Sequence, residues 1–299
     1  MLIGAHVSTA GGLSQAVPRG VGRDCRAIQI FNQSPRMWRP TAYDEDDFAA
    51  FREALGATDI EAVLIHAVYL LNCASEDPEI VAKSRASLIQ SLRVGAGIGA
   101  TAVVLHPGSA KTGAVGPAVE RAGKVIGQAL GETEGCPLHL ENTAGAGGTL
   151  GRSFEELAAL IDAAGGDRRL GVCLDSCHLF ASGYDIRTRD GLAETIDRCV
   201  ATIGARRIGS LHLNDSQTPL GSNRDRHATI GEGELGDGGC ALYLSEPRFE
   251  KLVCVIETPG DGDGSGSREE VEHCFALRKR GVAQRTRAAR PRRHAAGAR

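Results

Sequence analysis

The sequence predicts an α/β protein with a (β/α)8 TIM barrel, and three observations support this prediction. Short runs rich in Val, Ile and Leu recur along the chain, with helical segments between most of them, as in parallel βαβ units. Eight such runs are present, the number of strands in this barrel. Each run changes from apolar to polar at its C-terminal end, where barrel active sites lie. The runs are LIGAHVS (2–8), AIQIFNQ (27–33), AVLIHAVY (62–69), TAVVLHPGS (101–109), PLHLENTAG (137–145), GVCLDSCH (171–178), IGSLHLND (208–215) and KLVCVIETPG (251–260).

The segments between the runs have the spacing of amphipathic helices. Ser153 and Glu156 form a capping box in SFEELAALIDAAGG, and apolar residues follow at helical spacing. Residues 44–55, 78–99 and 192–204 have the same character. The weakest segment is 10–23, where Pro18 must stand near the start of a helix or bend it.

A doubly wound open sheet is the alternative with the same order of elements. It is expected to carry a GxGxxG fingerprint in its first turn, and GAHVSTAGG (4–12) does not match. We therefore expect residues 1–277 to form a single barrel domain with a metal site at its C-terminal mouth.

Composition indicates a soluble, cytoplasmic protein without membrane contact. The chain has 299 residues, 42% of them hydrophobic, which is ample for a packed core. No apolar run is long enough to span a membrane, and the start lacks the features of a signal peptide. Nine scattered cysteines indicate reduced core thiols rather than disulfides or a Cys-based zinc site.

Charge is distributed unevenly along the chain. The formal net charge is −3, but nine of the 34 Lys and Arg residues lie from Arg278 onward, where no acidic residue occurs. The preceding part has 37 acidic residues against the remaining 25 basic ones. We expect residues 278–299 to form a basic, flexible tail, with a nucleic-acid-binding arm as the second interpretation.

Residues able to bind metal follow six of the eight runs. Neutral imidazoles and carboxylates are donors that zinc or manganese takes, and the strand ends of a barrel surround one mouth. In NRDRH, Asp225 and His227 stand two residues apart and therefore share one side of an extended segment. The candidate ligands are His66, His106, Glu141, Asp175, His178, His212, Asp225, His227 and Glu257.

This number of ligands exceeds what one tetrahedral ion can hold, so we expect two or three ions that share a carboxylate. Four carboxylates and three divalent ions together carry about +2, which allows an acidic protein to bind a phosphate. Other histidines have other expected places. His139 is expected to be structural, His6 to lie just outside the ligands, and His273 and His294 to lie at the surface or in the tail.

Several segments resemble the endonuclease IV family of apurinic/apyrimidinic (AP) endonucleases, trinuclear zinc (β/α)8 barrels that repair DNA. They are HAVYLLNCAS (66–75), GVCLDSCHLFASGYDIRT (171–188) and LHLNDSQTPLGSNRDRHATIGEGELG (211–236), together with LHPGS, LENTAG and VIET. The resemblance extends from about residue 2 to residue 260.

The resemblance implies how the ligands divide among three zinc ions. Glu141 would bridge two ions and accept the proton of the attacking water. The family also pushes side chains into the duplex at the lesion, and the matching positions are Arg36, Tyr69 and Leu70, which suit filling the gap left by a missing base. Taken alone, Tyr69 and Leu70 would be expected in the core. The implied zinc groups are His66, His106 and Glu141; Glu141, Asp175, His212 and Glu257; and His178, Asp225 and His227.

Three positions depart from the family pattern. Val68 stands where relatives often have Pro, Ser176 where Thr is usual, and Gln217 where Lys is usual. We expect little effect from the first two, which keep size or hydroxyl. The third removes a possible phosphate contact and could weaken DNA affinity. The basic tail has no family counterpart.

The resemblance implies a zinc-dependent enzyme that acts on double-stranded DNA. A duplex bound at the rim suits a monomer, and we expect no obligatory protein partner. The enzyme would cleave 5′ to abasic sites, leaving a 3′-hydroxyl and a 5′-deoxyribose phosphate, and would trim blocked 3′ ends. One alternative is a metal-dependent sugar isomerase or epimerase, which would need only Glu141, Asp175, His212 and Glu257. The other is a non-catalytic DNA-binding protein that uses the basic tail.

Overall fold

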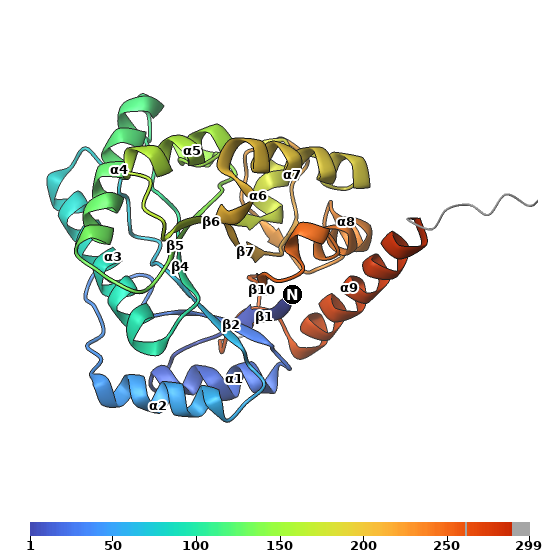
Figure 1. Ribbon diagram of the computed structural model, residues 1–299, viewed down its shortest axis with the longest axis horizontal. Helices are drawn as coiled ribbons and strands as arrows, with labels where there is room; N and C mark the ends of the chain where they lie inside the picture. Colours follow the sequence, from blue (N-terminus) through green and yellow to red (C-terminus); the bar gives the residue numbers. More distant parts are fainter. Residues whose placement is uncertain (261, 289–299) are drawn as a thin grey trace, which may run out of the picture.

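The computed structural model describes residues 1–260 and 262–288 and shows a closed barrel of parallel strands with helices around it (Figure 1). Each strand pairs with the next along the chain, and β10 closes the barrel between β7 and β1. The eight barrel strands coincide with the eight apolar runs, which confirms the predicted fold. They are β1 (Leu2–His6), β2 (Ala27–Phe31), β3 (Ala62–His66), β4 (Ala102–Leu105), β5 (Leu138–Glu141), β6 (Leu170–Asp175), β7 (Ile208–His212) and β10 (Val253–Ile256).

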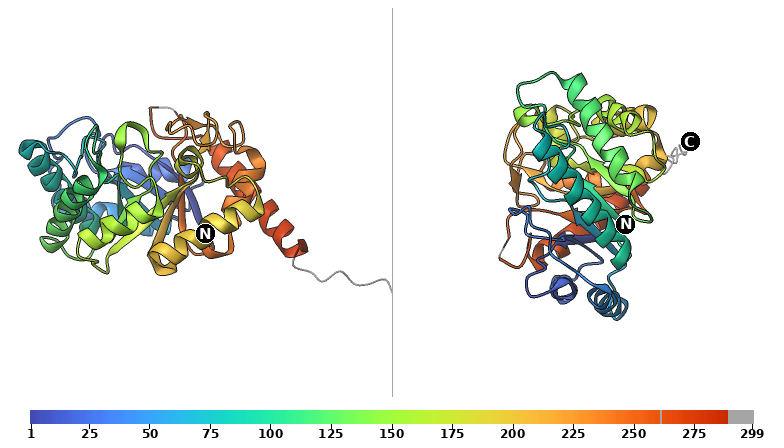
Figure 2. Two further views of the ribbon diagram at one scale, coloured as in Figure 1. Left: turned by 90° about the horizontal axis from the view of Figure 1, so that it is seen from above. Right: turned by 90° about the vertical axis from the view of Figure 1, so that its left-hand side faces the viewer.

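Helices pack around the outside of the barrel, as both views of Figure 2 show. Pro18 is near the start of α1, where its missing N–H costs least. At α5, Ser153 accepts from the Glu156 N–H at 3.2 Å, as predicted. The Glu156 carboxylate, however, accepts from Gly151 and Arg152 instead of closing the capping box. The helices are α1 (Ala16–Gly22), α2 (Glu45–Gly56), α3 (Pro78–Ile98), α4 (Val115–Gly131), α5 (Phe154–Ala163), α6 (Ser176–Ser182), α7 (Arg189–Ile203), α8 (Gly236–Leu244) and α9 (Arg268–Ala288).

Two short strands lie outside the barrel, in the long loop that follows β7. β8 (Asp215–Ser216) pairs antiparallel with β9 (His227–Ala228). This pairing closes a hairpin over the mouth. The chain leaves the strand ends after Ser216 and returns to them at His227.

The interior of the barrel is filled below the mouth. Because side chains alternate along a strand, a residue two positions before a mouth residue points inward beneath it. His139 lies in this layer, and its Nδ1 is 2.9 Å from the Ser210 hydroxyl, which agrees with a structural role. The inward residues below the mouth include Leu64, His139, Cys173 and Ser210, all buried.

Helix α9 extends to Ala288 and so includes residues 278–288 of the predicted tail. Arg278 donates to the Leu244 carbonyl at 2.6 Å, and Arg285 donates to the Ser245 carbonyl at 2.5 Å. The prediction of a flexible tail is therefore wrong for 278–288, because carbonyl groups of α8 and of the residue that follows it fix these cations on the barrel. Residues 289–299, including His294, lie outside the described residues.

The end of α9 lies on the side of the barrel opposite the mouth. The Arg278 guanidinium is 3.8 Å from the sulfur of Met1, which precedes the first residue of β1. Since β1 ends at the mouth, Met1 marks the other side. The basic end of α9 therefore points away from the strand ends that carry the candidate ligands.

Two predictions from composition can be compared with the described part of the chain. All nine cysteines are buried and form no disulfide. None of the described helices combines the length and apolar character that a membrane crossing requires.

Candidate metal centre

The structure brings all nine candidate ligands together at the C-terminal ends of the strands. In the described part of the chain they form three groups, and the donor atoms of each group lie within 4.8 Å of one another. The groups are His66, His106 and Glu141; Glu141, Asp175, His212 and Glu257; and His178, Asp225 and His227.

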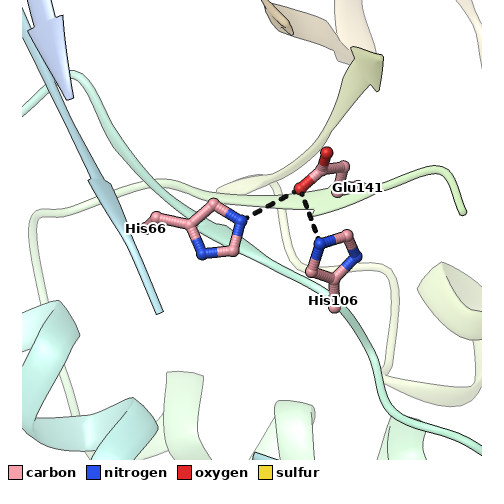
Figure 3. A group of neighbouring side chains, drawn as sticks. All are labelled: His66, His106 and Glu141. Atoms are coloured by element: carbon pink, nitrogen blue, oxygen red, sulfur yellow. Dashed lines mark hydrogen bonds and ion pairs between the residues drawn. The ribbon is translucent and has the colours of Figure 1, made fainter. Parts of the chain in front are cut away.

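The first group forms around one oxygen of Glu141. The Nε2 atoms of His66 and His106 lie 3.1 and 3.4 Å from Glu141 Oε2, and Figure 3 shows both rings directed at the carboxylate. In a tetrahedral zinc site with bonds of 2.0–2.1 Å, ligand atoms are about 3.3 Å apart. The observed spacings therefore suit three ligands of one ion.

The second group forms around the other oxygen of Glu141. Nδ1 of His212 lies 3.0 Å from Glu141 Oε1, 3.3 Å from Glu257 Oε2 and 4.0 Å from Asp175 Oδ2. Because its two oxygens face different groups, Glu141 has the geometry of a bridging carboxylate.

The third group depends on the hairpin over the mouth. Nε2 of His178 and Nε2 of His227 lie 3.2 and 3.1 Å from the two oxygens of Asp225. Both nitrogens are buried, yet within the described residues neither makes a hydrogen bond with acceptable geometry. A buried polar atom without a well-formed hydrogen bond is costly, and a cation shared with Asp225 would satisfy both nitrogens.

Four of the five histidines are oriented by their second ring nitrogen. In each of these rings that nitrogen faces an amide or backbone oxygen, which can only accept, so the nitrogen must donate. In the neutral ring the other nitrogen then presents its lone pair to a carboxylate, an arrangement that needs a cation between them. The donated bonds run from His66 Nδ1 to Ala67 O (2.7 Å), His178 Nδ1 to Asn142 O (2.9 Å), His227 Nδ1 to Glu257 O (3.3 Å) and His212 Nε2 to Gln29 Oε1 (2.8 Å).

The electrostatics of the centre favour bound cations. Burial by itself raises the pKa of Glu141, but the imidazoles of His106 and His212 hold that pKa well below its usual range. Burial lowers the pKa of His212, while Cys173, Glu257 and Glu141 together raise it well above the ordinary value. Glu141 thus stays ionised, and protons and metal ions compete for the same positions.

A thiol also lies near the third group. The donor atoms of Asp175, Cys177 and His227 lie within 4.8 Å of one another, a combination that the sequence did not suggest. Burial raises the pKa of Cys177 to about 12, so that the neutral thiol predominates. Since metals bind the thiolate, the histidine and carboxylate groups are the better sites.

Three amide side chains that the sequence analysis missed form hydrogen bonds with candidate ligands and hold them in place. Asn214 donates to Asp175 Oδ2 at 2.5 Å and accepts from the Glu257 N–H at 2.9 Å. Asn142 accepts from the Asp175 N–H at 2.6 Å, and Gln29 donates to Glu257 Oε1 at 2.6 Å. The signal in the sequence was a polar residue inside or directly after an apolar run.

Asp215 follows β7 but is not in any of the metal groups of the described residues. It is fully buried, and its carboxylate collects backbone N–H groups from the loop after β9. This carboxylate therefore anchors the base of the hairpin that carries Asp225 and His227. One donor is the N–H group of Ser216 in β8 (2.8 Å), and the donors that follow β9 are the N–H groups of Gly231 (3.1 Å), Gly233 (3.0 Å), Leu235 (2.8 Å) and Gly236 (3.1 Å).

A cavity of about 290 Å³ opens beside the metal groups. Its lining includes the candidate ligands His106, His178 and Asp225 together with Tyr69. The His106 and Asp225 side chains are 31% and 48% exposed, whereas the His66 and Glu141 side chains are buried. A substrate can therefore reach the centre from the side of His106 and Asp225.

The expected DNA-contacting residues occupy different environments. Tyr69 is 64% exposed, and its ring packs edge-on against Phe31 at 5.2 Å. Leu70 is half-buried and packs against the core. Arg36 is exposed in the loop after β2, next to Pro35, which lines a second cavity of about 610 Å³.

The other two described histidines match their expected places. His6 is outside the metal groups, and its Nδ1 is 3.3 Å from Gln29 Nε2. His273 lies on α9, partly exposed, with Nε2 2.8 Å from Asp237.

Comparison with known proteins gives the family. The family model described as a xylose isomerase-like TIM barrel matches residues 22–278. A relative from Geobacter sp. (strain M21), named "Probable endonuclease 4", is 39% identical over 88% of this chain and 94% of its own. Another of that name, from Chlorobium phaeovibrioides, is 36% identical over 92% and 99%. The crystal structure of endonuclease IV from Thermus thermophilus matches with a TM-score of 0.80 and 36% identity over 95% of this chain and all of that one.

The chain belongs to the endonuclease IV family. Membership of this family confirms the predicted resemblance and the barrel fold. It also confirms the predicted enzyme class, which is a nuclease. A D-tagatose 3-epimerase-like protein also matches, with a TM-score of 0.72 over 96% of this chain, but at 18% identity it shows the fold alone.

Within the endonuclease IV family, the three departures can now be located. Val68 is buried, and the Ser176 hydroxyl donates to the Asn214 carbonyl at 2.8 Å and accepts from its N–H at 2.9 Å. Gln217 donates to the His227 carbonyl at 2.8 Å and so braces the hairpin. A side chain at 217 thus supports a ligand backbone as well as lying at the rim.

Proposed function

We propose that this protein is a zinc-dependent DNA repair endonuclease that hydrolyses the phosphodiester 5′ to abasic sites in double-stranded DNA. The products would be a 3′-hydroxyl and a 5′-deoxyribose phosphate, and blocked 3′ ends would be trimmed at the same site. The observation that carries the proposal is the bridging geometry of Glu141, whose two oxygens belong to two different metal groups.

Three zinc ions would be held by the three groups, since the donors are imidazole nitrogens and carboxylate oxygens at the spacing of ligands. When bound, zinc polarises phosphoryl oxygens, makes water a stronger nucleophile near neutral pH and stabilises the leaving oxygen.

The chain's own residues would orient the reacting groups and accept a proton from the attacking water. Glu141 is buried and ionised, so it is placed to accept the proton of the attacking water. His106 and Asp225 form the exposed side of the centre, where the scissile phosphate would approach. Tyr69, beside the same cavity, would close that approach to bulk water once the duplex is bound.

Arg36, Tyr69 and Leu70 would contact the DNA at the lesion. An exposed aromatic ring at the rim of a charged site is unusual for a soluble surface and suits stacking in the gap of a missing base. Specificity would follow from the low cost of kinking a duplex at an abasic site. For Tyr69→Ala we expect weaker binding to an abasic duplex by about 1–3 kcal/mol and unchanged zinc content; equal affinity would remove Tyr69 from this role.

The remaining features of the proposal are a monomer without an obligatory protein partner, in the cytoplasm. A duplex lying across the mouth leaves no need for a second subunit to complete the site.

The sugar isomerase or epimerase alternative has less support. Glu141, Asp175, His212 and Glu257 alone would serve such an enzyme. It would have no use for the two further groups built on His66 and His178, which share the same mouth. Three zinc ions per chain would favour the nuclease, and a single manganese ion the isomerase.

The deciding experiment uses the full chain loaded with zinc and a duplex that carries one abasic site, labelled separately at each end. We expect incision 5′ to the lesion, a 3′ end that a DNA polymerase extends, and no incision of the intact duplex. Chelation should abolish the activity, and zinc should restore it. Incision on the 3′ side, or incision that does not depend on metal, would refute the proposal.

A further inference from the structure

Strand β2 carries no ligand, yet it places a polar side chain inside the mouth. Gln29 is completely buried and lies in the middle of the apolar strand Ala27–Phe31. A buried amide is costly unless its groups are hydrogen bonded. Its environment therefore indicates what it does.

The amide of Gln29 joins two ligands of the second metal group. Its Oε1 is 2.8 Å from His212 Nε2, and its Nε2 is 2.6 Å from Glu257 Oε1. The remaining N–H of the amide is directed at His6 Nδ1, at 3.3 Å. All of its polar atoms are thus in use.

The chemistry of these partners fixes the orientation of the amide. An ionised carboxylate can only accept, so the NH2 group must face Glu257 and the oxygen must face His212. The His212 Nε2 must then carry a hydrogen. In the neutral ring, Nδ1 is therefore the nitrogen with the free lone pair, and it is Nδ1 that lies 3.0 Å from Glu141 and 3.3 Å from Glu257.

The same amide selects the oxygen of Glu257. Since Oε1 accepts from Gln29, Oε2 is left facing His212 Nδ1. One side chain thus directs one donor atom of each of two ligands toward the same point.

His212 differs in this respect from the other oriented histidines. The rings of His66, His178 and His227 donate to backbone carbonyls, which no substitution removes. His212 donates to a side chain. Its orientation can therefore be tested by changing one residue that is not a ligand.

We propose that Gln29 is a positioning residue for the metal group of Glu141, Asp175, His212 and Glu257, selecting the Nε2–H tautomer of His212 and the coordinating oxygen of Glu257. This inference rests on the proposed function, because it requires a divalent ion in that group.

The test replaces Gln29 with Met, which has similar size and no amide. We expect the folded variant to bind one of its zinc ions about 10–100-fold more weakly, as for other residues that orient ligands. The other two ions should keep their affinity. Ser91→Ala is the matched control. It removes another buried hydrogen bond, which Ser91 donates to Asn32 at 2.9 Å. The hydrogen bonds of the Ser91 side chain involve no candidate ligand.

Two readouts separate positioning from a general loss of structure. Chelator competition with Zn²⁺ gives the affinity of each ion, and the ¹⁵N spectrum of the zinc-loaded protein gives the His212 tautomer. In the wild-type protein, Nε2 should carry a hydrogen that exchanges slowly with water. In Gln29→Met that exchange should be fast.

Each outcome is informative. Full zinc affinity and an unchanged His212 signal in Gln29→Met would overturn the inference. If that variant does not fold, Gln29→Asn keeps an amide but withdraws it by about one C–C bond of 1.5 Å, and wild-type affinity there would overturn the inference equally. A wild-type chain that binds no divalent ion would instead refute the proposed function.

Discussion

Replacement of Asp215 by Asn should destabilise the protein although it changes only one atom of the side chain. The carboxylate is buried and accepts five backbone N–H groups, two on Oδ1 and three on Oδ2. Asparagine keeps one oxygen and turns the other position into a donor. In its better orientation, the amide retains the three bonds of Oδ2 and leaves the N–H groups of Ser216 and Leu235 without an acceptor.

The cost can be worked from these contacts. Each buried N–H left without an acceptor costs about 1–3 kcal/mol, so the two together cost about 2–6 kcal/mol. With about 2–4 °C lost per kcal/mol in a large domain, the melting temperature should fall by on the order of 10 °C. Because Asp215 pairs with Ala228 at the base of the hairpin, the ion held by Asp225 and His227 should be lost first.

The assay is urea and thermal unfolding of Asp215→Asn, with zinc content measured on the folded protein. Asp197→Asn is the control, since Asp197 is 73% exposed and pairs with Arg248 at the surface. Such exposed pairs contribute little to stability. Equal unfolding of the two variants, or loss of the ion from the group of His66 first in Asp215→Asn, would contradict this prediction.

Three further predictions concern the centre and the C-terminus. Glu141→Gln should lower incision by about 10²–10⁴-fold while the far-UV circular dichroism stays unchanged, because the amide neither bridges as an anion nor accepts a proton; near-normal incision would contradict this. Burial lowers the pKa of His227, but Asp225 raises it to about 9. An ion must therefore displace a proton, and zinc affinity at this group should rise with pH up to about 9; a flat profile in titrations would speak against it. Truncation after Ala288 should leave incision unchanged, whereas truncation after Arg278 removes half of α9 and should lower the melting temperature; equal melting temperatures would show that 279–288 does not support the barrel.

Local patterns in the sequence were sufficient for the strands and for the candidate ligands. An apolar run that ends in His66 or Glu141 identifies both a strand and a donor at its end. In a parallel barrel the C-terminal ends of all strands lie at the same mouth, so these donors must lie there. Local patterns did not predict that residues 278–288 belong to helix α9. Charge alone suggested a tail, and the carbonyls that bind Arg278 and Arg285 are distant in the chain.

The type of fold, the residues that end its strands and the donor chemistry at the mouth could be read from the sequence, because periodicity and residue type are local properties. The folded barrel was needed to show that Glu141 faces two groups with separate oxygens and that Asp215 anchors a loop instead of joining these groups. The reason is that the direction of a side chain depends on partners across the barrel. Gln29 and His212, separated by 183 positions, meet only once the strands have closed.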